Sequence, residues 1–333
     1  MAESHQQSAE NKLLQDIYSI TFSNDKSQSA YQLKRALKDV PSHCLRNTLK
    51  KTTSYGYIIP DANSFFDDVH VSAGTTLIYS LCREPVTENL LRVVCDHLGE
   101  DHLIELLQLK DVRQQTPLHH AAETDAFAYW KCGNLLRLNT LMDYISNNHT
   151  LFQLLKTQDC DGKTPLHHLF GDPYMVFPDG KTCVKQILFS RLSSMAYAAQ
   201  LLQIKDIKGE TLLHRVATCH RGSSISVIAD WCSLLSTEQL VNVLGVQNKN
   251  GDNVFHKIYA SDSPITNHSH SIINPCKLLN EICAVSHTQR RHLSHLLLQR
   301  NNSGTTPLDI AASCGLYIDQ GKSVDPLYSI CLS

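Results

Sequence analysis

The sequence predicts an all-α helical solenoid, a stack of similar units joined by short turns or hairpins. A block related to T-P-L-H recurs six times in the 333-residue chain, with 40 to 53 residues from one copy to the next. A glycine stands two residues before the block in five copies. Two adjacent apolar residues stand seven and eight positions further upstream, also in five copies. The blocks begin at Thr76, Thr116, Thr164, Thr211, Asn253 and Thr306. Such repetition is typical of stacked units that bury a shared core.

Each block predicts a tight turn followed by the start of a helix. Asp161-Gly162 is a dipeptide that tolerates the positive φ of such turns. Thr164 suits a helix N-cap, because its hydroxyl can accept from a free N–H group of the first helical turn. Pro165 suits the next position, where a missing N–H costs nothing. The same pair opens two other blocks, at Thr116-Pro117 and Thr306-Pro307.

Two further helices are expected in each unit. The first follows the block and covers Val86–Leu98, Asn134–Ile145, Cys183–Leu192, Ser226–Leu235 and Pro275–Val285. The second is an extra helix that carries the apolar pair and covers Asp101–Leu109, Leu151–Lys156, Ala196–Ile204, Thr237–Val246 and Gln289–Leu298. Ser236 and Gln239 form a capping box for one of these extra helices.

The turn and helix start resemble the ankyrin repeat, whose T-P-L-H-x-A signature is matched by Thr116-Pro117-Leu118-His119 and Thr164-Pro165-Leu166-His167. The resemblance covers residues 74–315. Ankyrin units have about 33 residues, so the extra helix and loops after the first helix lengthen the units here. The resemblance implies that the first His of the block hydrogen-bonds within its motif and to the neighbouring turn. That role falls to His119, His167, His214 and His256, with Tyr79 and Asp309 in the same place in the outer copies.

Three segments are expected along the chain. Residues 1–73 form a degenerate helical N-terminal cap, with helices over Glu10–Ile20, Gln28–Val40 and Ser42–Lys51 and an irregular connector over residues 53–73. Residues 74–315 form six ankyrin-like repeats. Residues 316–333 form a short C-terminal tail.

Composition excludes several classes of protein. The formal net charge is −2, so no polyanion such as nucleic acid is favoured as a partner. The N-terminal stretch has no secretory pattern and no long apolar run predicts a membrane span. The 12 cysteines include no C-x-x-C pair. We therefore expect reduced thiols and a cytoplasmic location; the oligomeric state is left open.

The adjacent His167 and His168 raise the question of a metal or catalytic site. Neighbouring residues on a helix point about 100° apart, so they cannot chelate one ion together. Neither G-x-S-x-G nor H-E-x-x-H is present. The sequence therefore predicts no catalytic residues, no metal and no cofactor.

The predicted function is a non-catalytic protein–protein interaction module, an adaptor, scaffold or regulatory subunit that binds partners on the concave surface of the stack. Two alternatives stay open: a bacterial effector acting on host proteins, and an enzyme with a catalytic centre hidden in residues 1–73 or in the insertion loops. The basic residues among the predicted contacts favour an acidic partner. The predicted contact residues are Lys163, His168, Lys208, Arg215, Lys249 and Lys257, together with Tyr129 and Trp130 in the stretch FAYWKCG, which is expected to be irregular.

Overall fold

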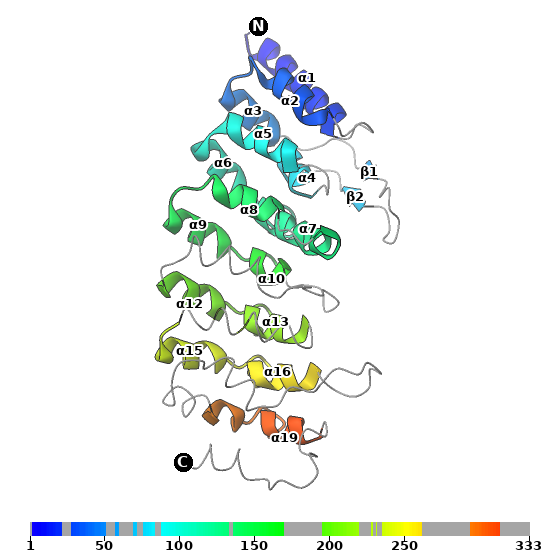
Figure 1. Ribbon diagram of the computed structural model, residues 1–333. Coiled ribbons are helices and arrows are strands. Elements are labelled where there is room, and N and C mark those ends of the chain that lie inside the picture. The colour runs from blue at the N-terminus through cyan, green and yellow to red at the C-terminus, as the bar shows by residue number, and fades with distance from the viewer. Residues whose placement is uncertain are drawn as a thin grey trace. The chain divides into compact units, whose positions relative to one another are not determined.

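The computed structural model consists of helices, turns and one pair of short strands (Figure 1). The chain divides into two compact units. Unit 1 comprises residues 1–128 and 134–160, and unit 2 comprises residues 129–133 and 161–333. The structure describes residues 2–21, 28–50, 57–59, 69–71, 76–83, 88–132, 136–169, 195–219, 228, 231, 235–261 and 294–313.

Unit 1 contains α1 to α9 and one pair of short strands. Its elements are α1 (Ala2–Thr21), α2 (Ser29–Leu37), α3 (Ser42–Lys50), β1 (Tyr57–Ile59), β2 (Val69–Val71), α4 (Leu77–Arg83), α5 (Glu88–Leu98), α6 (Glu100–Leu107), α7 (Pro117–Cys132, whose last four residues are assigned to unit 2), α8 (Leu136–Asp143) and α9 (Asn148–Leu155). The orders α4-α5-α6 and α7-α8-α9 confirm the prediction of three helices per repeat.

Layers of helices in unit 1 stack directly on one another. Helix α3 packs on α1, α5 and α6, and α5 packs on α2 and α8. Helix α5 packs on its neighbours through one apolar face. Leu91, Val94 and Leu98 recur on this face at three- and four-residue spacing and are buried. The apolar pair Leu106 and Leu107 at the end of α6 is also fully buried. The pairs that mark the repeat in the sequence therefore belong to the core.

A buried ion pair fixes the junction between α7 and α8. The carboxylate of Asp125 on α7 accepts hydrogen bonds from the backbone N–H groups of Arg137 and Leu138, in the first turn of α8. It also lies 3.1 Å from the guanidinium of Arg137. Burial raises the pKa of Asp125, although the amide donors and the Arg137 charge oppose that shift. The pair therefore caps α8 from within the core.

Unit 2 repeats the same scheme. Its helices are α10 (Pro165–Leu169), α12 (Met195–Gln203), α13 (Leu212–Cys219), α15 (Thr237–Leu244), α16 (Val254–Ser261) and α19 (Pro307–Ser313). Helices α10, α13, α16 and α19 pack in succession, and α12 packs on α15 (Figure 1). The predicted capping box is present, because Ser236 and Gln239 exchange side-chain to backbone hydrogen bonds at the start of α15.

Parts of the prediction lie outside the described residues. This holds for Cys183–Leu192, for Pro275–Val285, for residues 316–333 and for most of Ser226–Leu235. Within the last segment, Ile228 and Trp231 are described, and both side chains are fully buried. None of the described helices combines the length and the apolar character needed to cross a lipid bilayer.

Three local predictions are wrong. Helix α1 begins at Ala2 rather than Glu10, because Ala2–Ala9 consists mostly of residues that tolerate a helix although it lacks an apolar stripe. The connector is not wholly irregular, since β1 and β2 pair antiparallel with Ile58 opposite His70. The stretch FAYWKC is helical, because no Gly or Pro interrupts α7 between Leu118 and Cys132.

Candidate functional site

The turns before α7, α13, α16 and α19 share one set of hydrogen bonds. In the first, Oδ1 of Asp111 accepts from the backbone N–H groups of Arg113 and Gln115, at 2.8 Å each. The N–H of Asp111 also donates to the carbonyl of Gln115. The same three bonds are made in the other turns by Asp206, Asn248 and Asn301. One Asp or Asn side chain thus closes each turn from inside.

Sequence reasoning missed this Asp or Asn. The signal was available, because five of the six copies have one of these residues three positions before the glycine position: Asp111, Asp159, Asp206, Asn248 and Asn301. Both residue types offer a side-chain oxygen at the length needed to reach N–H groups two and four residues on. The repeat signature is therefore longer than the T-P-L-H block and its glycine.

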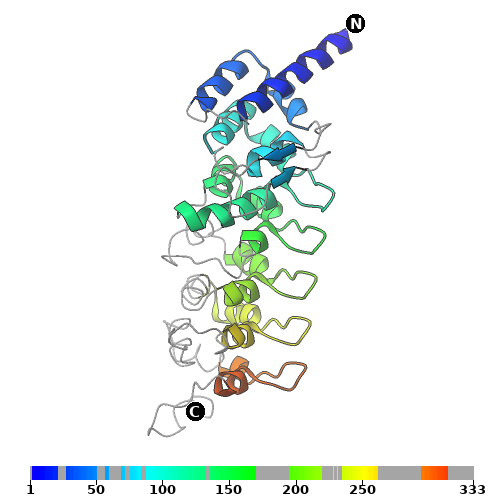
Figure 2. The same cartoon turned by 90° about the vertical axis from the view of Figure 1, so that its right-hand side faces the viewer.

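Backbone hydrogen bonds join successive turns within each unit. In unit 2, the N–H of Ile207 donates to the carbonyl of Asp161 at 2.9 Å, and the N–H of Lys249 donates to the carbonyl of Lys208 at 3.0 Å. Asn302 bonds to Asn250 in the same way, and in unit 1 Cys160 bonds to Arg113. The turns before α13, α16 and α19 project to the same side (Figure 2). We call this row of bonded turns the turn ladder.

The ladder explains the repeated glycine. Gly162, Gly209 and Gly251 have φ between +72° and +78°, a region that other residues adopt only with strain. A Cβ atom on Gly209 would also lie 2.9 Å from the backbone nitrogen of Lys249. Gln114 takes this place in unit 1 with φ of 60°. Glycine is therefore favoured both by backbone conformation and by the closeness of the next turn.

The first His of each T-P-L-H block bonds to the first residue of the block. In the second copy, the N–H of Thr116 donates to Nδ1 of His119 at 3.0 Å, and the Thr116 hydroxyl lies 2.8 Å from the same nitrogen. Thr164 with His167 and Thr211 with His214 repeat both contacts. In these three copies the Thr hydroxyl faces the His ring, whereas the sequence predicted that it would accept from the free N–H groups of the helix start. The predicted bond is made in the last copy, where the hydroxyl of Thr306 accepts from the N–H of Asp309.

These bonds fix the tautomer of the ring. Because a backbone N–H donates to Nδ1, that nitrogen carries no proton, and the proton of the neutral ring sits on Nε2. Nε2 of His214 then donates to the carbonyl of Asp252 at 2.9 Å, and Nε2 of His256 donates to that of Thr305 at 3.1 Å. Burial lowers the pKa of His214 and of His256, although the carbonyl bonds act in the opposite direction. His214 and His256 therefore each join their own helix to the next turn.

In three copies, other residues make the side-chain hydrogen bonds at the helix start or to the next turn. In the first copy, the hydroxyl of Tyr79 donates to the carbonyl of Gln115 in the next turn. In the fifth, the side chain of Asn253 caps α16 by accepting from the N–H of Phe255, while its amide donates to the carbonyl of Leu296. In the last, Asp309 accepts from the N–H of Thr306. The residues differ in these copies, but each copy still makes a side-chain hydrogen bond at the helix start or to the next turn.

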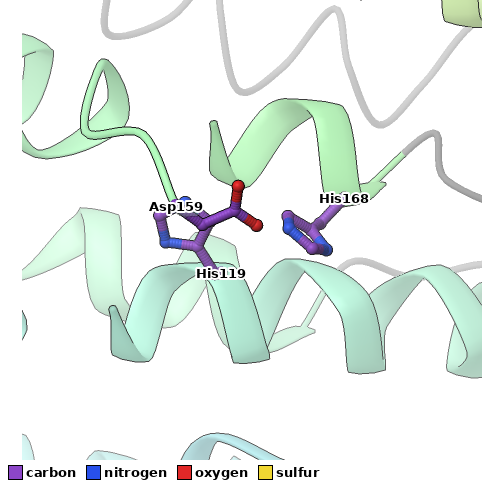
Figure 3. Close-up of side chains that lie close together, drawn as sticks. All are labelled: His119, Asp159 and His168. Atoms are coloured by element: carbon purple, nitrogen blue, oxygen red, sulfur yellow. The ribbon is translucent and has the colours of Figure 1, made fainter. Parts of the chain in front are cut away.

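His119, Asp159 and His168 are drawn in Figure 3. His119 on α7 and Asp159 belong to unit 1, and a ring nitrogen of His119 lies within 4.8 Å of an Asp159 carboxylate oxygen. His168 on α10 belongs to unit 2 and is partly exposed, whereas its neighbour His167 is buried. Since Nδ1 of His119 is occupied by Thr116 and a structural zinc site needs four ligands, we assign no metal site to His119 and Asp159.

Three of the predicted contact residues are held by acidic neighbours in unit 2. Lys163 pairs with Asp161 at 3.0 Å. Lys257 on α16 pairs with Glu210 at 2.8 Å, and Arg215 on α13 lies 3.9 Å from the same carboxylate. Burial alone would raise the pKa of Glu210, but the bond and charge of Lys257 outweigh it and the pKa lies below its usual range. Glu210 therefore links the side chains of two successive layers.

Lys208 and Lys249 differ from these residues. Both are exposed on neighbouring turns, and neither side chain has an ion-pair or hydrogen-bond partner among the residues that the structure describes. The side chains of Tyr129 and Trp130 lie outside the described part, although their backbone belongs to α7. Among the predicted Lys and Arg contact residues, all of which the structure describes, Lys208 and Lys249 are therefore the two without an ion pair.

The closed turns, the T-P-L-H helix starts and the stacked helices define an ankyrin-like repeat protein with elongated units. Among solved structures, the chain is similar to the ankyrin repeat domain of Bcl-3, described as a unique member of the IkappaB protein family. The two are 16% identical, with 95% of this chain and 97% of that chain covered, and a TM-score of 0.40. No protein-family model and no curated protein matches the chain.

Proposed function

We propose that the chain is a non-catalytic protein-binding module, an adaptor, scaffold or regulatory subunit that contacts its partner through the turn ladder. The observation that carries this proposal is the contrast between frame and surface. The hydrogen bonds of the turns before α7, α13, α16 and α19 are the same, whereas the exposed residues at the tips of these turns differ. The exposed pairs are Val112-Arg113, Ile207-Lys208, Lys249-Asn250 and Asn302-Ser303. Binding residues gather on such projecting positions of a rigid scaffold.

The contact residues predicted from the sequence include Lys163, Lys208, Arg215 and Lys249. Ion pairs divide these four residues into two groups. Lys163 and Arg215 are partly neutralised by Asp161 and Glu210, so each would have to leave that neighbour to pair with a partner. Lys208 and Lys249 keep their whole charge for a partner. An acidic protein in the cytoplasm is the partner that we propose, and an adaptor role is favoured over the effector and enzyme alternatives.

The test is affinity capture with the full chain as bait, followed by mass spectrometry of the captured proteins. Two matched variants are then used as baits in the same way and compared with the wild type. The first variant replaces Val112, Arg113, Ile207, Lys208, Lys249 and Asn302 with Ser. The second replaces the same number of exposed residues in unit 1, at Tyr31, Gln32, Lys34, Arg35, Lys38 and Asp39. We expect a protein captured by the wild type to be lost from the first variant and kept by the second. Equal capture by both variants would remove the turn ladder as the binding surface.

A further inference from the structure

We infer that Ile207, Lys208 and Lys249 form one binding patch for an acidic segment of a partner protein that also carries an apolar side chain. This inference rests on the proposed protein-binding function and names the site and the chemistry of its partner. All three residues lie in unit 2, on the turns that precede α13 and α16. We call them the Ile207 patch.

The backbone N–H group of each residue in the patch is hydrogen-bonded. The N–H of Ile207 bonds to Asp161, the N–H of Lys208 bonds to Oδ1 of Asp206, and the N–H of Lys249 bonds to the carbonyl of Lys208. The last bond sets the two lysines on adjacent turns in a fixed register. A partner that binds here does not have to order the backbone, so less of the binding energy is lost.

The two lysines of the patch are not engaged in ion pairs. Lys208 and Lys249 are exposed and form no ion pair with any residue in the described part of unit 2, whereas Lys163 in the turn before α10 and Lys257 on α16 are paired with Asp161 and Glu210. Two unpaired cations on adjacent turns repel each other, and carboxylates of a partner would relieve that repulsion. The patch therefore selects for negative charge.

An exposed aliphatic side chain lies beside these cations. Ile207 is 53% exposed and is one of the few large apolar side chains that are exposed in the described part of the chain. The equivalent position in unit 1 is Val112, which is 97% exposed and is followed by Arg113. The same order, an aliphatic residue and then a cation, thus recurs at the same two positions of a turn. Covering Ile207 with an apolar side chain of the partner would add to binding.

The patch suits carboxylates better than phosphates. Phosphate sites commonly use several free backbone N–H groups. Here the N–H groups of Lys208, Gly209 and Glu210 are bonded to Asp206 within the turn, and those of Asn250 and Gly251 are bonded to Asn248. Only lysine ammonium groups remain as donors, and as point charges they attract carboxylates and phosphates alike. The lack of free N–H groups and the exposed Ile207 are what favour an acidic peptide segment over nucleic acid.

The experiment selects binders from a displayed library of random peptides on the full wild-type chain. Selected peptides are then measured by fluorescence anisotropy against variants. We expect Asp and Glu to be enriched around an aliphatic or aromatic residue. The double change Lys208→Glu and Lys249→Glu should weaken these peptides at least about tenfold, and Ile207→Ser should weaken them less. Lys34→Glu on α2 with Lys38→Glu directly after the helix changes the net charge equally and should leave affinity unchanged.

Several results would overturn the inference without touching the proposed function. One is a set of peptides without acidic enrichment, or no selected peptide at all. Another is equal affinity for the wild type and the Lys208→Glu, Lys249→Glu variant. A single-stranded DNA oligonucleotide that binds as tightly as the peptides would also overturn it. The proposed function fails separately, when the capture experiment with Ser at all six tip positions retains the natural partner. Circular dichroism of each variant checks that helicity is kept.

Discussion

The backbone nitrogen of Lys249 lies 2.9 Å from the point where a side chain on Gly209 would begin. Gly209 also has φ of +73°. A residue with a Cβ atom would therefore meet two penalties at once, a left-handed backbone and a clash with the next turn. Gly304 separates these two penalties, because it has φ of +76° but no atom within 4 Å of its Cβ position.

We predict that Gly209→Ala lowers the free energy of unfolding by about 2–4 kcal/mol, and that Gly304→Ala lowers it by only about 1–2 kcal/mol. The difference is the cost of pushing the turn of Lys249 away. Urea denaturation followed by circular dichroism measures both values. Equal losses in the two variants would show that the turns do not pack as closely as the ladder requires.

Gln114 offers the reverse experiment. It is a non-glycine residue with φ of 60° at the position where the other turns have glycine. Gln114→Gly should raise the free energy of unfolding by roughly 0.5–1 kcal/mol, because relief of backbone strain exceeds the added entropy of the unfolded chain. Gln114→Ala keeps the strain and should give no gain. A lower urea midpoint for the glycine variant would contradict the expected relief.

Stability should fall on acidification below neutral pH. Burial lowers the pKa of His214 and of His256 in the folded chain, whereas in the unfolded chain it is about 6.5. The unfolded chain therefore binds more protons as the pH drops, so their contribution is present above about pH 6.5 and is lost as the pH falls toward the folded values. Urea midpoints between about pH 7.5 and 5 measure this loss. His214→Gln should show a weaker pH dependence than wild type; an identical slope would assign the effect to other groups.

The pair Asp125 and Arg137 should behave as a unit. Asp125→Ala leaves a buried guanidinium without its carboxylate and removes the cap of α8, so we expect a loss of about 3–5 kcal/mol in unfolding free energy. The double variant Asp125→Ala with Arg137→Met removes both charges and should recover part of that loss. A thermodynamic cycle of single and double variants gives the coupling. Additive losses would mean that the two side chains are independent.

Much of the fold could be predicted because the decisive residues are local. Thr-Pro pairs set the starts of α7, α10 and α19 at Pro117, Pro165 and Pro307, where the helices begin. Helix ends are harder, as α7 shows: its end depends on the absence of a breaker before Gly133 rather than on a positive signal. The strands β1 and β2 have three residues each, too few for an alternating pattern to stand out.

Candidate contact residues were harder to predict, because their surroundings depend on stacking. Glu210 meets Arg215 five residues later, but it also meets Lys257 from the next layer. No local pattern brings Glu210 and Lys257 together; the packing of α13 on α16 does. Asp206 is the opposite case, since its turn bonds are local and its recurrence could have been read from the sequence. Whether a charged side chain of a repeat protein is available to a partner therefore depends on the packing of successive layers, which the sequence alone does not give.

Amide hydrogen exchange at Lys249 tests the turn ladder most directly. The side chain of Lys249 is exposed, yet its N–H is bonded to the carbonyl of Lys208 on the neighbouring turn. A rigid ladder that presents variable side chains predicts that this amide exchanges at least about a hundredfold more slowly than in an unstructured chain. Exchange at the unstructured rate, while amides within α13 and α16 stay protected, would show that the turns move independently and would contradict the account.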